Sequence, residues 1–363
     1  MGTISFARGI PAPECLPVEE LADCARACIE RDGPVVLSYG SPGGYEPLRE
    51  WIGERHGVDP SRVLLTNGSL QGFVLLAQRF AGTPVLVERP TYDRPLKILG
   101  DLGSTIVPLE MDDEGLDPDA LERALREGSK PGFLYTIPTF QNPSGRTLSI
   151  ERRRRLVELA LEHDLLVLED DPYGLVRFEG DALPTLFELA AAAGDTGRFV
   201  YSSSFSKTVA PGIRVGYFVL PAVLESELQA AAVATYITPA LVGQATVYEF
   251  LRRGHFDPNL ERVGSLLRVR RDAMLDALER ELPSARWNRP DGGYFLWLEL
   301  PDETDASVLL ARAEQAGVSF VPGSDFGGDP NTARLAYSFV SLAEIAEGVA
   351  RLATCLEAHA IPA

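Results

Sequence analysis

Residues 165–173 read Leu-Leu-Val-Leu-Glu-Asp-Asp-Pro-Tyr, a short apolar run that ends in carboxylates and an aromatic ring. An apolar run of this length, bounded by a turn signal, is typical of a buried strand. Polar side chains at the end of such a strand lie where a parallel sheet binds its ligands. This stretch therefore indicates both the fold and the place of the functional site.

Similar apolar runs lie on both sides of this stretch, separated by longer amphipathic segments. The whole set occupies residues 63–66, 85–88, 106–109, 133–136, 165–169, 199–202 and 215–219. Apolar strands that alternate with helices are typical of a mainly parallel sheet with helices on its faces. We therefore predict an α/β fold with a mainly parallel, seven-stranded sheet flanked by helices.

A second unit is expected after the sheet. The pattern is helical from 220 to about 282, followed by a strand at 294–300, a helix at 306–317, a strand around 334–339 and a closing helix. We expect an amphipathic helix at 18–31 to pack on this C-terminal unit rather than on the sheet. The predicted domains are a large cofactor-binding domain at 35–260 and a small α+β domain formed by 1–34 and 261–363.

Composition narrows the choice of function. The chain has 363 residues, 45% hydrophobic content and a formal net charge of -18, which argues against nucleic acid or an anionic membrane as partner. No apolar stretch has the length of a membrane span and the first residues lack a signal-peptide pattern, so we expect a cytoplasmic protein. Cysteines at 15, 24, 28 and 355 are expected to be free thiols, and the scattered histidines predict no metal site.

Lys207 ends the run Ser-Ser-Ser-Phe-Ser-Lys at 202–207, directly after a predicted strand, and Arg214 follows one short loop later. Lysine can form a Schiff base with a carbonyl, while hydroxyls and a guanidinium can hold a phosphate dianion. Pyridoxal phosphate, an aldehyde that carries a phosphate, needs both. Taken alone, the string is better explained by an ordinary surface lysine in a Ser-rich turn.

Further motifs follow other predicted strands. The turn at 66–72 directs backbone N–H groups and the Ser69 hydroxyl to one point, which suits a phosphate, although N-capping by Ser69 also explains it. Tyr92 can stack on a flat heteroaromatic ring or pack in the core. Asn142, in a proline turn, can donate to a phenolate oxygen or simply form the turn.

The end of the opening stretch completes this set. Asp170 can hold a pyridine nitrogen protonated, and Tyr173 can reach the phenolic oxygen of the same ring, although acidic residues at strand ends are often solvated or cap helices. Each motif is ambiguous alone. Their order along the sheet, and their convergence with Lys207 on the needs of one cofactor, favour pyridoxal phosphate (PLP).

Taken together, the motifs resemble those of the fold-type I PLP enzymes, specifically the class I/II aminotransferases of the 2-aminoadipate/kynurenine and branched-chain/aromatic type. The resemblance covers nearly the whole chain, through residues 4–11, 37–45, 141–145, 322–324 and 334–339. It implies the PLP-dependent transferase fold, transfer of an amino group between an α-amino acid and a 2-oxo acid by a ping-pong mechanism, and a homodimer with shared active sites.

The resemblance also implies roles for the cofactor site. Lys207 would carry the cofactor and move a proton between the substrate Cα and the cofactor C4′. Asp170 would pair with the ring nitrogen, Tyr92 would stack on the ring, and Asn142 and Tyr173 would bond the phenolic oxygen. The phosphate would be held by Ser69, the backbone N–H of Leu70, Ser204, Ser206 and Arg214.

Substrate contacts are implied as well. Arg334 resembles the residue that clamps the α-carboxylate, a task that suits a planar guanidinium, and a surface arginine is the alternative. Asn142 is expected to contact the substrate as well as the cofactor. Gly9 resembles the glycine that lies over the substrate, and Tyr39 the tyrosine contributed across the dimer interface.

The chain departs from the family pattern at two positions. Leu70 stands where Gln is frequent, which removes a polar side chain from the phosphate site. Arg8 stands where a small residue is common. An added cation beside Gly9 either favours a second anionic group on the substrate or is a solvent-facing charge on the N-terminal arm.

Two other functions fit the same motifs. A PLP enzyme of a specialised-metabolite pathway could use the same chemistry for β/γ-elimination, replacement or carbon–carbon bond formation. A regulatory module that binds PLP without catalysis would carry an N-terminal DNA-binding region, whereas here the resemblance starts within the first ten residues and the charge is acidic. Amino donor and acceptor stay open; Tyr236, Tyr294 and Phe326 are better explained by core packing than as pocket residues.

Overall fold

The structure is a computed structural model that describes residues 2–128, 130–195 and 197–360. The strands are β1 Ile4–Ser5, β2 Val63–Thr66, β3 Val85–Arg89, β4 Ile106–Asp112, β5 Gly115–Leu116, β6 Phe133–Thr136, β7 Val167–Asp170, β8 Phe199–Ser204, β9 Gly216–Val219, β10 Arg286–Trp287, β11 Phe295–Glu299, β12 Val318–Ser319, β13 Val321–Pro322 and β14 Thr332–Ala336.

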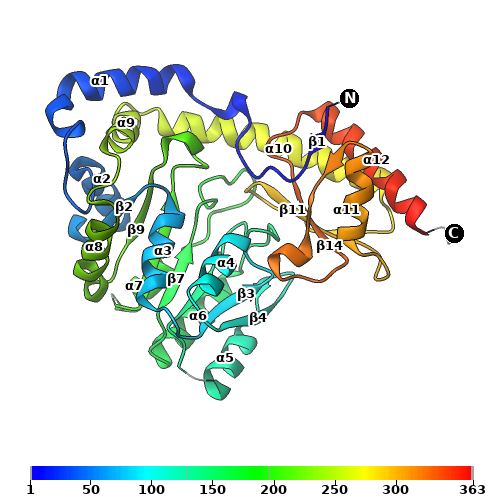
Figure 1. Cartoon of the computed structure of the whole chain (residues 1–363), viewed down its shortest axis with the longest axis horizontal. Helices are drawn as coiled ribbons and strands as arrows, with labels where there is room; N and C mark the ends of the chain where they lie inside the picture. Colours follow the sequence, from blue (N-terminus) through cyan, green and yellow to red (C-terminus); the bar gives the residue numbers. More distant parts are fainter. Residues whose placement is uncertain (1, 129, 196, 361–363) are drawn as a thin grey trace.

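Helices connect and cover these strands (Figure 1). They are α1 Val18–Val36, α2 Glu46–His56, α3 Ser69–Arg79, α4 Asp93–Asp101, α5 Pro118–Glu127, α6 Ile150–Glu162, α7 Leu186–Ala192, α8 Ala222–Tyr236, α9 Leu241–Arg252, α10 Phe256–Glu281, α11 Ala306–Gln315 and α12 Leu342–Ala360. In the described part of the chain, no helix combines the length and the apolar character needed to cross a membrane.

The large sheet confirms the predicted fold class. Its eight strands follow the order β2-β9-β8-β7-β6-β3-β4-β5, and the neighbours from β8 to β4 run parallel. β9 is antiparallel to both of its neighbours. The seven predicted runs are all present as strands, and the eighth strand is the two-residue β5, which folds back on the end of β4. A pairing that short has no periodicity to detect.

The strands of the large sheet, apart from the two-residue β5, contribute side chains to two cores, one on each face of the sheet. In β2, Val63 and Leu65 pack toward one face with α2, α6 and α9, while Leu64 packs toward the other with α3 and α8. This alternation follows from the two-residue period of a strand, and burial on both faces explains why the runs are apolar throughout. The parallel strands therefore end together at one edge, where the polar motifs lie.

A separate core holds the C-terminal unit. There, β10, β11, β14 and β13 form a four-stranded sheet that shares its core with α10, α11 and α12, and α10 packs along α12 (Figure 1). The N-terminal arm joins this unit because β1 pairs with β12 and Phe6 is buried in the same core. The proposed domain boundaries, at 34/35 and 260/261, stay a prediction; α10 runs through the second of them.

The expected position of the first helix is wrong. α1 packs along α9 beside the large sheet and not on the C-terminal unit, as Figure 1 shows. Cys24 and Cys28 lie in the core of the large sheet, and the Arg31 guanidinium binds the Glu249 carboxylate at 2.6 Å. The apolar face was predictable, but its partner α9 follows more than two hundred residues later in the sequence.

Candidate functional site

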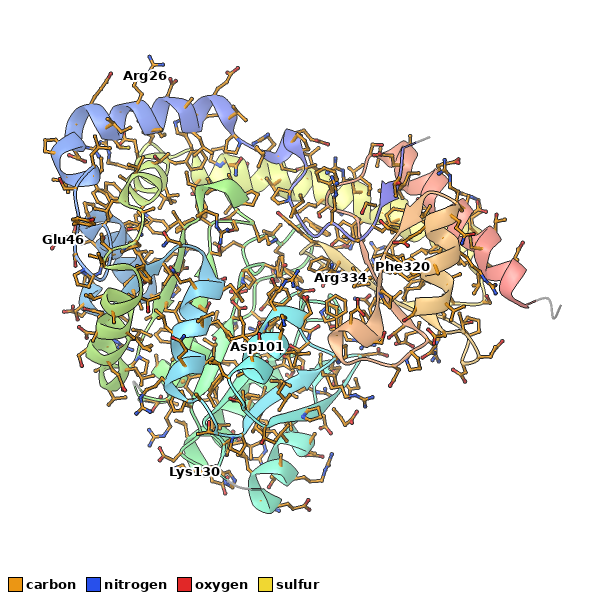
Figure 2. All side chains as sticks on the ribbon, in the orientation of Figure 1. Arg26, Glu46, Asp101, Lys130, Phe320 and Arg334 are labelled. Atoms are coloured by element: carbon orange, nitrogen blue, oxygen red, sulfur yellow. The ribbon has the colours of Figure 1, made fainter. Side chains whose placement is uncertain are left out.

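One cavity of about 700 Å³ collects the predicted site residues at the carboxyl ends of the parallel strands. Figure 2 places Arg334 where the C-terminal unit meets the part of the molecule that carries the large sheet. With the exception of Tyr39, every candidate lines the cavity: Arg8, Gly9, Ser69, Leu70, Tyr92, Asn142, Asp170, Tyr173, Ser204, Ser206, Lys207, Arg214 and Arg334.

Asp170 is a half-buried carboxylate held only by neutral donors. Its Oδ2 accepts a hydrogen bond from the Tyr135 hydroxyl at 2.9 Å, and its Oδ1 accepts one from the Ser202 hydroxyl at 3.1 Å. Burial raises the pKa of Asp170 to about 6, against the effect of these two bonds. No ion pair forms at Asp170 within the described residues, so a cationic group in the cavity would find an uncompensated carboxylate there.

Lys207 lines the cavity and lies three residues after the end of β8. Its Nζ donates to the backbone oxygen of Gly9 at 2.8 Å and lies 5.7 Å from the centre of the Tyr173 ring. Burial, and then repulsion from Arg334 and Arg214, lowers the pKa of the Lys207 amine to about 8. An amine with this pKa has a substantial neutral, nucleophilic fraction near neutral pH.

One part of the cavity is lined by hydrogen-bond donors that suit a phosphate group. α3 begins at Ser69 with Gly68 as its N-cap, so simple N-capping by Ser69 is excluded. The Ser204 and Ser206 hydroxyls lie 2.9 Å apart, and Arg214 reaches Ser206 at 3.5 Å.

A glycine allows this close approach. Gly68 has φ +93°, and a Cβ there would lie 2.1 Å from Nη2 of Arg214. Nη2 of Arg214 in turn donates to the backbone oxygen of Asn67 at 2.9 Å, which fixes the guanidinium beside the start of α3. The helix N-terminus, the hydroxyls and the guanidinium are the donor set that a phosphate dianion requires.

Arg334 is a buried residue of β14, and its guanidinium does not use all of its hydrogen-bond donors. Nη1 donates to Oδ1 of Asn142 at 2.8 Å and Nη2 donates to the backbone oxygen of Ala7 at 3.0 Å, while Nε is buried without a hydrogen-bond partner. The guanidinium lies over the rings of Phe295 and Phe326, at 4.4 and 4.8 Å from their centres. The surface-arginine alternative is therefore wrong, and the amide nitrogen of Asn142 is left to donate to a ligand.

The N-terminal arm forms one wall of the cavity. Besides the bonds at Ala7 and Gly9, the Ser338 hydroxyl donates to the backbone oxygen of Ile10 at 2.9 Å. A Cβ at Gly9 would lie 2.5 Å from the Phe295 ring, so this close packing requires glycine. Arg8 is exposed at the rim, with its guanidinium 5.1 Å from the centre of the Phe339 ring.

Other aromatic candidates lie in different places. Tyr39 is 80% exposed and is not part of the cavity of its own chain. Phe326 lines the cavity, contrary to the expectation of core packing alone. Tyr294 is buried behind Lys207 and donates to its backbone oxygen at 2.9 Å, while Tyr236 packs on the core beside α3.

Several functional contacts were not anticipated from the sequence. Tyr135 and Ser202 clamp Asp170, and Phe295 supports both Gly9 and Arg334. Tyr135 and Ser202 lie on β6 and β8, the two strands that flank β7. The order of the strands in the sheet would therefore have pointed to both residues as neighbours of Asp170. Outside this site, the described residues contain no group of three or more His, Cys, Asp or Glu side chains placed to hold a metal ion.

These residues fit the expected cofactor. PLP carries an aldehyde, a phosphate and a basic ring nitrogen, and the cavity offers the half-buried amine of Lys207, the donor set around Arg214 and the uncompensated carboxylate of Asp170. Tyr92 lines the same cavity, half-buried, from the start of α4. A buried carboxylate without a cation is costly, so a protonated ring nitrogen opposite Asp170 would relieve that cost.

Comparison with known proteins gives a consistent result. The family model "Aminotransferase class I and II" matches residues 12–352. The chain is 43% identical to the 2-aminoadipate transaminase of Thermus thermophilus, over 98% of this chain and 90% of that protein. It is 35% identical to aromatic-amino-acid aminotransferase 1 of Thermococcus litoralis, over 98% and 88%.

A solved structure shows the same arrangement. The α-aminoadipate aminotransferase of Thermus thermophilus, complexed with N-(5′-phosphopyridoxyl)-L-leucine, superposes with a TM-score of 0.94. The two chains are 40% identical, and the match covers 98% of this chain and 92% of that one. The similarity therefore extends over both the large sheet and the C-terminal unit.

Proposed function

The chain belongs to the class I and II aminotransferases, PLP-dependent enzymes that move an amino group between an α-amino acid and a 2-oxo acid, and we propose how its residues carry this reaction. The relatives named above are transaminases, which favours amino transfer over elimination, replacement or carbon–carbon bond formation. The proposal rests on one cavity that holds the half-buried amine of Lys207, an uncompensated carboxylate at Asp170 and a phosphate-type donor set at Arg214.

Lys207 is proposed as the residue that binds the cofactor and moves the proton at the substrate Cα. When bound, PLP supplies an electron sink that makes this proton acidic. The lowered pKa of Lys207, to about 8, supports its use as a base near neutral pH. Its bond to the Gly9 oxygen orients the amine within the cavity.

The ring and the phosphate are proposed to be held by the residues that the sequence singled out. Asp170 would accept from the ring nitrogen, Tyr92 would cover the ring, and Asn142 with Tyr173 would bind the phenolic oxygen. The phosphate contacts would come from Ser69, the backbone N–H of Leu70, Ser204, Ser206 and Arg214. Leu70 lines the cavity with an apolar side chain, so only its backbone can contribute a donor.

Arg334 is proposed to bind the substrate α-carboxylate. Its buried charge has no ion-pair partner within the described residues, and its unpartnered Nε can donate to an incoming oxygen. Gly9 would lie over the substrate, and Asn142 would contact it beside Arg334. Arg8, exposed at the rim, is proposed to favour donors that carry a second carboxylate.

The chain is further proposed to act as a cytoplasmic homodimer in which Tyr39 enters the partner's site. Tyr39 is exposed, as are the apolar side chains of Val35 and Leu37 shortly before it in the chain. Ile237, on the neighbouring α8–α9 connection, is also apolar and exposed. Exposed apolar side chains of this kind mark an association surface. The cysteines are free thiols, as expected in a reducing compartment.

The experiment is a single-turnover assay with a panel of donors. The PLP-loaded protein is mixed with 2-aminoadipate, glutamate, leucine or phenylalanine, and pyridoxamine phosphate and the 2-oxo acid are measured together. We expect both products in equal amounts from at least one donor, and none from Lys207→Ala. Lys130→Ala, which changes an exposed lysine paired with Asp164, is the matched control and should keep the activity.

The same panel tests Arg8. Arg8→Ala should lower kcat/KM for the dicarboxylic donors by about tenfold, the effect of roughly one charged hydrogen bond, and leave leucine unchanged. An equal loss for all donors would contradict a role in selecting a second carboxylate. Absence of pyridoxamine phosphate with every donor would contradict the assignment of the reaction as a whole.

A further inference from the structure

Glu88 is a buried carboxylate that the reaction itself does not use. It lies near the end of β3, is 2% exposed, and forms no ion pair within the described residues. Burial, aided by the nearby charge of Asp170, raises the pKa of Glu88 to about 7 against its hydrogen bonds. A buried acidic group without a cation is costly, so the structure around it has to offset that cost.

Neutral donors from β6, which is the neighbour of β3 in the sheet, and from the loop after β6 surround this carboxylate. Oε1 accepts from the Thr136 hydroxyl at 2.5 Å and from the backbone N–H of Ile137 at 3.2 Å. Oε2 accepts from the side-chain amide of Gln141 at 2.9 Å. Glu88 therefore ties the end of β3 to the end of β6 and to the loop that follows it.

The Gln141 side chain makes two further hydrogen bonds, one to each of two loops. Its Nε2 also donates to the backbone oxygen of Pro90 at 2.8 Å, and its Oε1 accepts from the backbone N–H of Ser144 at 2.8 Å. Both polar groups of the buried Gln141 side chain are therefore used, and each holds a different loop.

The two loops carry two residues of the proposed cofactor site. Tyr92 is two residues beyond Pro90, and Asn142 directly follows Gln141. We propose that Glu88, acting through Gln141, is a positioning residue that holds Tyr92 and Asn142 in place at the cofactor ring. The inference rests on the proposed site, because it assigns Glu88 a role only through those residues.

The change from carboxylate to amide tests this role with little change of shape. In Glu88→Gln, one acceptor oxygen becomes an NH₂ group that faces the N–H donors of Ile137 or Gln141. One of those donors then loses its acceptor in a buried site, and the loops are expected to shift. Thr136→Val, which is similar in shape, removes one donor to Glu88 and is expected to act in the same direction with a smaller effect.

Glu169 provides a matched control. It is also a fully buried glutamate, next to Asp170, and burial raises its pKa to about 7. Its partners are the backbone N–H groups of Leu186 and Phe187 at the start of α7, at 2.9 and 2.8 Å, and not the cofactor loops. Glu169→Gln therefore reports the general cost of losing a buried carboxylate.

The experiment uses PLP-loaded wild type and the Glu88→Gln, Thr136→Val and Glu169→Gln variants. The dissociation constant of the cofactor is measured on serial dilution, the visible circular dichroism reports how the ring is fixed, and thermal unfolding reports stability. We expect Glu88→Gln to weaken cofactor binding about tenfold, equivalent to about 1.4 kcal/mol, and to reduce the dichroic band. Glu169→Gln should lose stability while both cofactor readouts stay within about twofold.

The outcomes separate the inference from the proposed function. The positioning role of Glu88 would be overturned if a folded Glu88→Gln variant kept its cofactor binding and dichroism. It would also be overturned if Glu169→Gln changed both readouts to the same extent. If Glu88→Gln does not fold, Thr136→Val decides: weaker binding supports the role and wild-type binding overturns it. Failure of the wild type to bind PLP would overturn the proposed site and this inference together.

Discussion

The charge of Lys207 is the residue-level property with the clearest consequence. Burial and two nearby arginines lower the pKa of its amine to about 8, well below the usual value of about 10.4 for lysine. Only the neutral amine attacks an aldehyde. The rate of PLP uptake by the cofactor-free protein should therefore rise about tenfold per pH unit up to pH 8 and level off above it, as measured by stopped-flow absorbance.

A neighbouring substitution checks the cause of that profile. Arg334→Gln removes a positive charge that lowers the pKa of Lys207, so the midpoint of the uptake profile should move to higher pH. A wild-type rate that keeps rising beyond pH 10 would show that Lys207 titrates as an exposed lysine.

The residues that line the cavity were the ones that sequence reasoning could find. Asp170, Asn142 and Lys207 follow apolar runs, and the ends of such runs meet at one edge of a parallel sheet. The residues that hold these side chains or their loops in place could not be found in the same way. Glu88 and Tyr135 lie inside strands, and their partners depend on which strands are neighbours and in what register.

At the level of the elements, one buried charge contributes to the contact between α1 and α9. Glu249 of α9 is fully buried and accepts hydrogen bonds from Arg31 of α1 and from Arg252 and Arg253 of its own helix. Burial acts to raise the pKa of Glu249, but the three arginines outweigh it and hold the pKa at about 2. This ion pair adds to the apolar packing of Cys24 and Cys28, which places α1 on the large-sheet side.

Removal of that charge should destabilise the protein. Glu249→Gln removes the carboxylate that Arg31, Arg252 and Arg253 share and leaves Asp32 as the partner of Arg31, and we expect a loss of about 1–3 kcal/mol because the arginines are partly exposed. Since the pKa of Glu249 lies below its usual value of about 4.3, its contribution is present above that pH and is lost as pH falls toward 2. Thermal unfolding at pH 7 and pH 3 measures both effects.

An exposed pair serves as the comparison. Glu227 binds Arg79 on the surface with both side chains nearly half exposed, so Glu227→Gln should change stability by less than about 0.5 kcal/mol. Equal losses from the two substitutions would contradict a special role of Glu249 in the attachment of α1.

At the scale of the whole molecule, the position of Tyr39 predicts shared sites. Lys207→Ala and Tyr39→Ala are each expected to be inactive. A mixed dimer of the two contains one site with an intact Lys207 and the partner's intact Tyr39. Equal mixing with subunit exchange should therefore restore about a quarter of wild-type activity, measured as product formation. Native mass spectrometry counts the mixed dimers, and mixed dimers without activity would contradict the proposal.

Lys207 is proposed to hold the cofactor covalently beside Asp170. The most direct measurement is borohydride reduction of the PLP-loaded protein followed by peptide mapping with mass spectrometry. We predict one phosphopyridoxyl group per chain, on the peptide that contains Lys207, and none in Lys207→Ala. A modified peptide that lacks Lys207, or an unmodified chain that still holds PLP, would contradict the account.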